Sequence, residues 1–150
     1  MFDITDVLVA TDGELGSRDA VEYAVAEAKA QDARLHALYV VDSDVYDAYS
    51  GDEYVHDLEG LESALESEGE HALDAVEEAA GDIEVRRVLR HGRPHEVVLR
   101  YIDEQDVDLV IMGTERRPEE YRQVLGSVTD RVTRLSEKPV VVVKTPTDED

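Results

Sequence analysis

The chain from Asp108 to Ser127 reads Asp-Leu-Val-Ile-Met-Gly-Thr-Glu-Arg-Arg-Pro-Glu-Glu-Tyr-Arg-Gln-Val-Leu-Gly-Ser, and this stretch decides the fold. Its apolar run, Leu109 to Met112, is typical of a strand buried on both faces, and we expect it to end at Gly113. A polar loop follows, and Ser127 with Asp130 three residues later indicates a helix N-terminus. Glycine lets a ligand approach the backbone closely, and the free N–H groups of a helix start favour an anion. The stretch therefore predicts a phosphate site.

On either side of this stretch, apolar runs and helical periodicity alternate along the chain. A loop is expected from Asp42 to His56, and the carboxyl-terminal helix is marked by Val128, Val132 and Leu135. Gly60 and Gly69 indicate either the true start of a long helix or a kink in it. The remaining expected strands are Ile4–Thr11, Leu35–Val41, Ile83–Leu89 and Pro139–Lys144, and the remaining helices are Arg18–Lys29, Leu58–Ala80 and one that begins near Pro94. This alternation predicts an α/β sandwich with a mainly parallel, five-stranded sheet.

Composition excludes several classes of function. The 150 residues fit one domain, and the absence of cysteine excludes disulfides, thiolate zinc sites and cysteine nucleophiles. No apolar run approaches the roughly 20 residues that span a bilayer, and the amino terminus lacks the pattern of a signal peptide. We therefore expect a cytoplasmic protein. No phosphate loop with a Gly-Lys pair and no serine nucleophile elbow is present, so dedicated catalysis is not indicated.

The charge of the chain is strongly negative. Fifteen Lys and Arg against 37 Asp and Glu give a formal net charge of −22. Such a charge repels nucleic-acid backbones and anionic lipid, and it destabilises the compact state unless salt screens it. The charge therefore favours a halophilic protein from a salt-rich cytoplasm, and an ordinary acidic mesophile protein is the alternative. A stability that does not rise between millimolar and molar KCl would contradict the halophilic interpretation.

The glycines of the first stretch resemble those of the universal stress protein (UspA-type) family. Nucleotide-binding members of that family carry Gly, two residues, Gly, nine residues, and then Gly followed by Ser or Thr. Gly113, Gly126 and Ser127 match this pattern, but Arg116 replaces the middle glycine. The resemblance extends to Val7–Gly13 as the first strand and to Arg90–Pro94 as the turn after the third. Together with the charge, it suggests a halophilic archaeon as the source.

The resemblance implies a three-layer sandwich with strand order 3-2-1-4-5, a topology like that of the adenine nucleotide alpha hydrolases. We expect one domain of this type over residues 1–144, followed by an acidic disordered tail over residues 145–150, because chain termini are usually poorly ordered. The resemblance also implies a sensor or regulatory module for stress response that binds an adenine nucleotide such as ATP, with Mg²⁺ as an accompanying ion, and that is at most a slow ATPase. The binding residues carried over are Thr11, Asp12, Gly13, Val40, Val41, Met112, Gly113, Thr114, Arg116, Gly126, Ser127 and Val128.

Within that set the resemblance implies separate roles. Gly126 and Ser127 would hold phosphates, Asp12 would contact the nucleoside, and the backbone at Val40 or Val41 would meet adenine. Arg116 either obstructs the phosphate or pairs with it. Glu14 would repel phosphates unless Arg116, Arg117 or a divalent ion neutralised it. The alternative function is therefore a stress-family dimer that binds no nucleotide and acts through protein contacts, including the loop from Tyr46 to Tyr54; a hydrolase of the wider superfamily is a weaker third interpretation.

Two further features have ordinary explanations. His91 and His95 are four residues apart and could share a helix face, but Pro94 lies between them, so we interpret them as a surface turn and expect no metal site. A row of carboxylates lies opposite the apolar stripe of the long helix, and we interpret it as a solvated face. It comprises Glu62, Glu66, Glu68, Glu70, Asp74, Glu77 and Glu78.

The last expected strand predicts an assembly. Val140, Val141, Val142 and Val143 follow one another with no charge before Lys144. If this strand forms the edge of the sheet, as the resemblance implies, it is exposed to aggregation unless it is covered. Pairing with a second copy would cover it, and a twofold homodimer needs only one self-complementary patch. The alternative is that a tail or helix of the same chain covers the edge.

Overall fold

The fold is described here from a computed structural model, which covers residues 3–12, 15–43, 58–116 and 127–146. Five parallel strands form one sheet in the order β3-β2-β1-β4-β5. They are β1 (Asp6–Ala10), β2 (Arg34–Asp42), β3 (Val85–Gly92), β4 (Leu109–Arg116) and β5 (Val140–Pro146). The parallel sheet and its strand order are confirmed, and β3 and β5 are its two edge strands.

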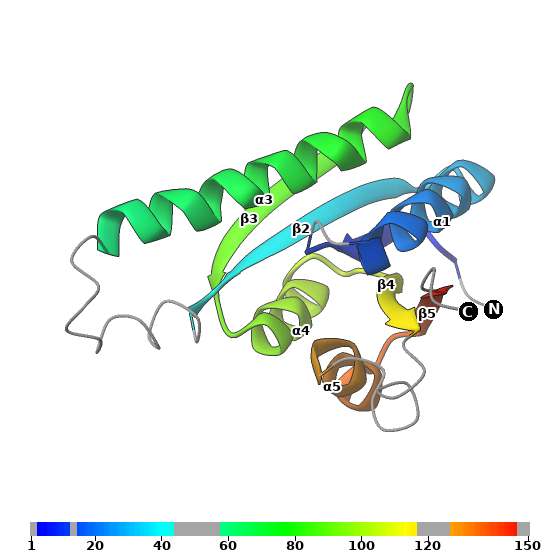
Figure 1. Ribbon diagram of the computed structural model, residues 1–150. Helices are drawn as coiled ribbons and strands as arrows, with labels where there is room; N and C mark the ends of the chain where they lie inside the picture. Colours follow the sequence, from blue (N-terminus) through cyan, green and yellow to red (C-terminus); the bar gives the residue numbers. More distant parts are fainter. Residues whose placement is uncertain (1–2, 13–14, 44–57, 117–126, 147–150) are drawn as a thin grey trace.

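Helices cover both faces of this sheet. They are α1 (Leu15–Gln31), α3 (Leu58–Ala80), α4 (Pro94–Glu104) and α5 (Ser127–Leu135). Helices α1 and α3 lie on one face, with α4 and α5 on the other (Figure 1). The three-layer sandwich is therefore confirmed. Among the described helices, none combines the length and apolar character needed to cross a membrane.

The side chains of each central strand divide between two hydrophobic cores because successive residues of a strand face opposite sides. Val7, Val9 and Ile111 pack beneath α1 and α3. Leu8 and Val110 belong to the second core, beneath α4 and α5. The strands are thus buried on both faces, which is why they appear in the sequence as continuous apolar runs.

Strands β4 and β5 continue beyond their expected ends. We expected the fourth strand to stop at Gly113, but its pairing with β5 extends to the Arg116–Pro146 register. Thr145 was expected in a disordered tail, yet it is buried in β5 and its hydroxyl donates to Asp19 Oδ2 at 3.0 Å. The expected tail is therefore wrong for residues 145–146, and residues 147–150 lie outside the described chain. Hydrogen bonds between strands, rather than hydrophobic pattern, extend both strands.

Helix α3 has the bounds that its periodicity predicts, and it passes through Gly60 and Gly69 without ending. Neither glycine is therefore the start of the helix. Gly69 is instead a point of close packing, because a Cβ atom there would lie 2.6 Å from Tyr39 Cδ1 and 2.7 Å from Leu89 Cδ1. Only glycine lets the helix approach β2 and β3 this closely.

Three smaller expectations also change. Leu135, one of the apolar residues that marked the last helix, is 60% exposed because α5 ends there. His91 and His95 were interpreted as a surface turn, but His91 lies in β3 and His95 lies in α4. Asp42, expected to begin a loop, is the last residue of β2, and residues 44–56 of that loop lie outside the described chain.

A polar network lies where the strands begin, at the end of the sheet that we call its amino-terminal edge. The carboxylate of Asp108, just before β4, accepts hydrogen bonds from the backbone N–H groups of Thr5 and Asp6 at 2.9 and 3.0 Å. Burial alone would raise the pKa of the Asp108 carboxyl, but these N–H groups and the Thr5 hydroxyl stabilise its charged form and bring the pKa below its ordinary value. The carboxylate therefore ties β1 to β4.

The same edge contains a buried histidine, His36, held between two partners. Its Nε2 atom lies 2.8 Å from Asp6 Oδ1, and its Nδ1 atom lies 2.6 Å from the hydroxyl of Tyr101 on α4. In the neutral tautomer with a proton on Nε2, the ring donates to Asp6 and accepts from Tyr101. Burial raises the pKa of the Tyr101 phenol, which keeps that donor protonated.

Candidate functional site

A cavity of about 420 Å³ lies at the carboxyl ends of β1, β2 and β4, which we call the carboxyl-terminal edge of the sheet. Its volume falls within the roughly 300–1,000 Å³ of small-molecule sites. Its position is the switch point of the sheet, because the connection from β1 leads to β2 on one side while β4 pairs on the other. Its walls are Ala10, Thr11, Asp12, Ser17, Leu38, Tyr39, Val40, Asp42, Leu65, Glu68, Pro94, Val98, Met112, Gly113, Val128 and Thr129.

Half of the twelve residues expected to bind a ligand line this cavity. They come from the ends of three strands and from the start of α5: Thr11, Asp12, Val40, Met112, Gly113 and Val128. Val41 faces away and belongs to the core beneath α1 and α3, so of the two alternatives the side chain of Val40 reaches the cavity.

The other expected binding residues divide into two groups. Thr114 and Ser127 are described but are not among the residues that line the cavity. Gly13 and Gly126 lie outside the described residues, and Arg116 is described only as the backbone end of β4. The convergence that we describe therefore depends on six residues.

Helix α5 is anchored beside Gly113. The hydroxyl of Thr129, a buried residue in the first turn of α5, donates to the backbone oxygen of Gly113 at 3.2 Å. This hydrogen bond brings the amino terminus of the helix to the end of β4, where Val128 also lines the cavity. The N–H groups of a first helical turn have no partners within the helix and favour an anion. The arrangement therefore suits a negatively charged group at this end of the cavity.

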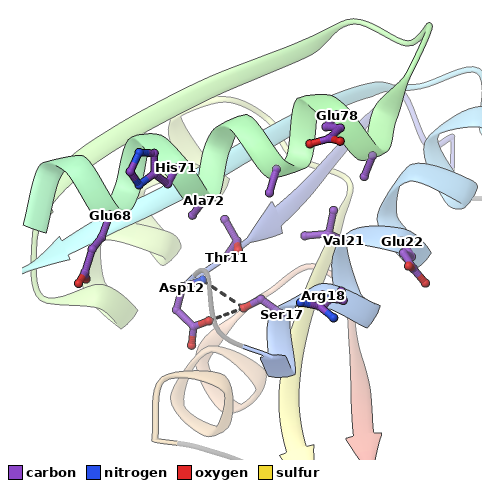
Figure 2. Close-up of a pocket in the computed structure, with 12 residues that line it drawn as sticks. Thr11, Asp12, Ser17, Arg18, Val21, Glu22, Glu68, His71, Ala72 and Glu78 are labelled. Atoms are coloured by element: carbon purple, nitrogen blue, oxygen red, sulfur yellow. Dashed lines mark hydrogen bonds between the residues drawn. The ribbon is translucent and has the colours of Figure 1, made fainter.

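Ser17 holds Asp12 in place, and sequence reasoning missed it. The backbone N–H of Asp12 donates to Ser17 Oγ at 3.1 Å, and the Ser17 hydroxyl donates to Asp12 Oδ1 at 2.6 Å. Figure 2 shows both bonds between the end of β1 and the first turn of α1. A hydroxyl five residues after the aspartate was the available signal. The pair fixes the carboxylate at the mouth of the cavity.

The described walls of the cavity are acidic. Asp12, Asp42 and Glu68 contribute carboxylates, and the described lining contains no lysine, arginine or histidine. Glu68, which was interpreted as part of a solvated face, is exposed and also lines the cavity. Like charges a few ångströms apart repel even in water. These walls therefore suit an uncharged or cationic part of a ligand, and phosphate groups are best accommodated at α5.

A second hollow of about 680 Å³ adjoins the first between α1 and α3. Thr11, Asp12, Ser17 and Glu68 line both. Figure 2 shows Thr11 and Asp12 at the end of β1, between α3 with His71 and α1 with Arg18. The site is thus part of a longer depression. Among the described residues that line it, the basic side chains are Arg18 and His71, and both line the second hollow only.

Comparisons with known proteins identify the family of the chain. The sequence model of the universal stress protein family matches residues 4–144. Universal stress protein MJ0531 of Methanocaldococcus jannaschii is 30% identical over 145 residues, which cover 95% of this chain and 84% of that protein.

Two solved structures resemble the fold. MJ0577, the subject of a structure-based assignment of biochemical function, has a TM-score of 0.78 at 21% identity and covers 97% of this chain and 99% of its own. A universal stress protein solved in complex with cAMP has a TM-score of 0.61 at 25% identity and covers 95% of this chain and 98% of its own. The first likeness concerns the fold alone.

Proposed function

Because this chain belongs to the universal stress protein family, we propose that it binds an adenine nucleotide at the carboxyl ends of β1 and β4 and acts as a regulatory module in a stress response. One observation carries the proposal: six residues expected to bind a nucleotide converge on one cavity of suitable size. The cAMP complex of a related universal stress protein supports the choice of ligand class.

The charges of the site suggest an orientation for the nucleotide. The adenosine part lies against Val40 and Met112, where the walls are apolar, and within reach of the fixed Asp12 carboxylate. The phosphates point to the first turn of α5, because its N–H groups and dipole are the favourable partners near the cavity. A divalent cation such as Mg²⁺ would offset the carboxylates of Asp12, Asp42 and Glu68.

Calorimetric titration in molar KCl with MgCl₂ tests this proposal. We expect saturable binding of at least one of AMP, cAMP and ATP. The variant Ser127→Asp adds a charge that is favourable at a helix start, so the fold is retained, but that charge repels a phosphate. We expect it to weaken nucleotide binding at least tenfold and to leave adenosine binding unchanged. Thr133→Asp, an exposed position in the same helix, is the matched control.

Two results would contradict the proposal. The first is the absence of binding heat with all three nucleotides at millimolar concentration. The second is a Ser127→Asp variant that binds AMP and ATP as tightly as the unaltered protein does. The variant Arg116→Gly tests the role of this arginine. Tighter nucleotide binding would mean that Arg116 obstructs the phosphate, and weaker binding would mean that Arg116 pairs with the phosphate.

The alternative function, a dimer that acts through protein contacts, is favoured by the acidic cavity walls and by the position of β5. Strand β5 is an edge of the sheet, and Val140, Val141, Val142 and Val143 are each only partly buried. We propose that a second copy pairs along this edge, since an unprotected apolar edge strand invites such pairing. The dimer is compatible with nucleotide binding and does not require it.

Sedimentation equilibrium in molar KCl tests the dimer. We expect twice the mass of the chain at micromolar concentration. Val142→Lys should yield a monomer with an unchanged circular dichroism spectrum, because Val140, Val141 and Val143, rather than Val142, pack against the two cores. Thr133→Lys controls for the added charge. A monomeric mass for the unaltered protein would contradict the proposal.

A further inference from the structure

Three side chains of types that bind metals converge at the edge strand β3, and none of them lines the cavity. Glu62 and Glu66 lie one turn apart on α3, and His91 is the second-last residue of β3. The Nε2 atom of His91 lies 2.9 Å from Glu66 Oε1 and 3.8 Å from Glu62 Oε1. One ligand atom from each of the three residues lies within 4.8 Å of the other two.

The surroundings of these residues differ from those of the other carboxylates of α3. Further along the helix, Glu70, Asp74 and Glu77 all pair with Arg87, at 2.8, 2.6 and 3.0 Å. In the described part of the chain, His91 is the only basic side chain within ion-pair distance of Glu62 or Glu66. With a neutral imidazole, the three groups carry two negative charges that no arginine or lysine among those residues balances. A divalent cation would balance them.

We propose that Glu62, Glu66 and His91 bind a divalent first-row transition metal ion of the zinc class. An imidazole nitrogen with carboxylate oxygens suits Zn²⁺ and its neighbours, whereas Mg²⁺ and Ca²⁺ prefer oxygen ligands throughout. Zinc lies about 2.0–2.2 Å from such ligands, so small rotations of the three side chains would close the site. Their side chains are 44–47% exposed, which permits those rotations and leaves an open position for water.

Binding of the ion would join the first half of α3 to the edge strand β3. This half of α3 also carries Leu65 and Glu68, which line the cavity at the carboxyl ends of the strands. A ligand that binds only the folded protein raises its melting temperature. Zinc should therefore stabilise the protein, and this effect does not depend on whether a nucleotide binds.

Titration of ZnCl₂ into the full chain, stripped with EDTA and then dialysed into molar KCl with excess MgCl₂, tests the proposal. The magnesium occupies sites made of carboxylates alone, so that the calorimeter detects a site that contains histidine. We expect one Zn²⁺ per chain and a higher melting temperature. His91→Gln and Glu66→Gln should each weaken binding at least tenfold. His95→Gln, which removes a histidine outside the cluster, should bind as the unaltered protein does.

Cobalt provides an independent readout, because Co²⁺ in the same site should give visible absorption bands that His91→Gln abolishes. The competing explanation is an ion pair between protonated His91 and the two glutamates, which needs no metal. No saturable zinc binding by the unaltered protein would establish that explanation and overturn the proposal. Zinc binding by His91→Gln at the affinity of the unaltered protein would overturn it as well. The exposed positions of these side chains keep the variants folded, as circular dichroism would verify.

Discussion

The two ends of the parallel sheet use polar side chains in opposite ways. At the amino-terminal edge, His36 is 3% exposed and bonded at both ring nitrogens, and Asp108 accepts three hydrogen bonds. At the carboxyl-terminal edge, Asp12, Asp42 and Glu68 face a cavity of about 420 Å³. The strands run between the two edges with apolar side chains on both faces. The difference suggests that one edge serves stability and the other serves binding.

This division has a physical reason. A buried polar group costs free energy unless it is paired, and among the described residues no buried side-chain nitrogen or oxygen lacks a partner. Pairing at the amino-terminal edge is complete within the chain, which leaves those groups little capacity for a ligand. At the other edge, the carboxylates and the first turn of α5 surround open space that a ligand can enter. Substitutions at the two edges should therefore have different consequences.

The largest effect on stability is expected at the amino-terminal edge. Tyr101→Phe removes the hydroxyl bonded to His36 Nδ1 and leaves that nitrogen buried without a partner. The free energy of unfolding should fall by about 1–3 kcal/mol, as measured by denaturant unfolding in molar KCl. Nucleotide affinity should not change. Tyr23→Phe, at a residue 42% exposed, is the matched control and should be neutral; an equal loss in both variants would refute the role of the buried bond.

A smaller loss of stability, with a loss of binding, is expected at the carboxyl-terminal edge. Thr129→Val keeps the side-chain shape but removes the hydrogen bond to the Gly113 carbonyl. Unfolding should become easier by about 0.5–1.5 kcal/mol, and nucleotide affinity should fall several-fold because α5 is no longer fixed beside β4. Thr133→Val removes a hydroxyl bond within the same helix and serves as the control. Unchanged affinity in Thr129→Val would remove the proposed positioning role of this bond.

The smallest effect is a dependence of stability on pH at Asp108. Its pKa is lowered in the folded protein, so its stabilising contribution is complete above the ordinary carboxyl value of 3.8 and is lost as the pH falls through the lowered folded value. Asp108→Asn should therefore be less stable than the unaltered protein at pH 7, and the gap should narrow below about pH 4. Unfolding curves of the two proteins between pH 7 and pH 3 measure this gap. A gap that widens with acid would contradict the assignment.

The sequence alone predicted the elements whose signal is local. Helix α3 kept both of its expected bounds because its apolar stripe recurs at helical spacing. The six cavity residues were implied by the resemblance to the universal stress protein family, which rests in part on the spacing of Gly113, Gly126 and Ser127. In each case the deciding information lay within one element or in a fixed spacing.

What the sequence did not predict depends on contacts between distant segments. β4 extends past Gly113 where β5 pairs with it, whereas the apolar run that marked this strand in the sequence ends at Met112. Glu68 is exposed, as expected, but its place at the cavity was not predicted, because helical periodicity does not say which loop ends lie opposite a helix. The cluster of Glu62 and Glu66 with His91 arises in the same way, since it forms only where α3 crosses the edge strand.

The most direct test of the different roles of the two edges is a titration of the ¹⁵N-labelled chain with ATP and MgCl₂ in molar KCl, followed by backbone amide shifts. At 16.7 kDa the protein is within reach of this measurement. We predict shifts for Thr11, Asp12, Gly113 and Thr129 at the carboxyl-terminal edge, and none for Asp6, His36 and Asp108 at the other. No shifts at millimolar ATP, or shifts confined to the amino-terminal edge, would contradict the account.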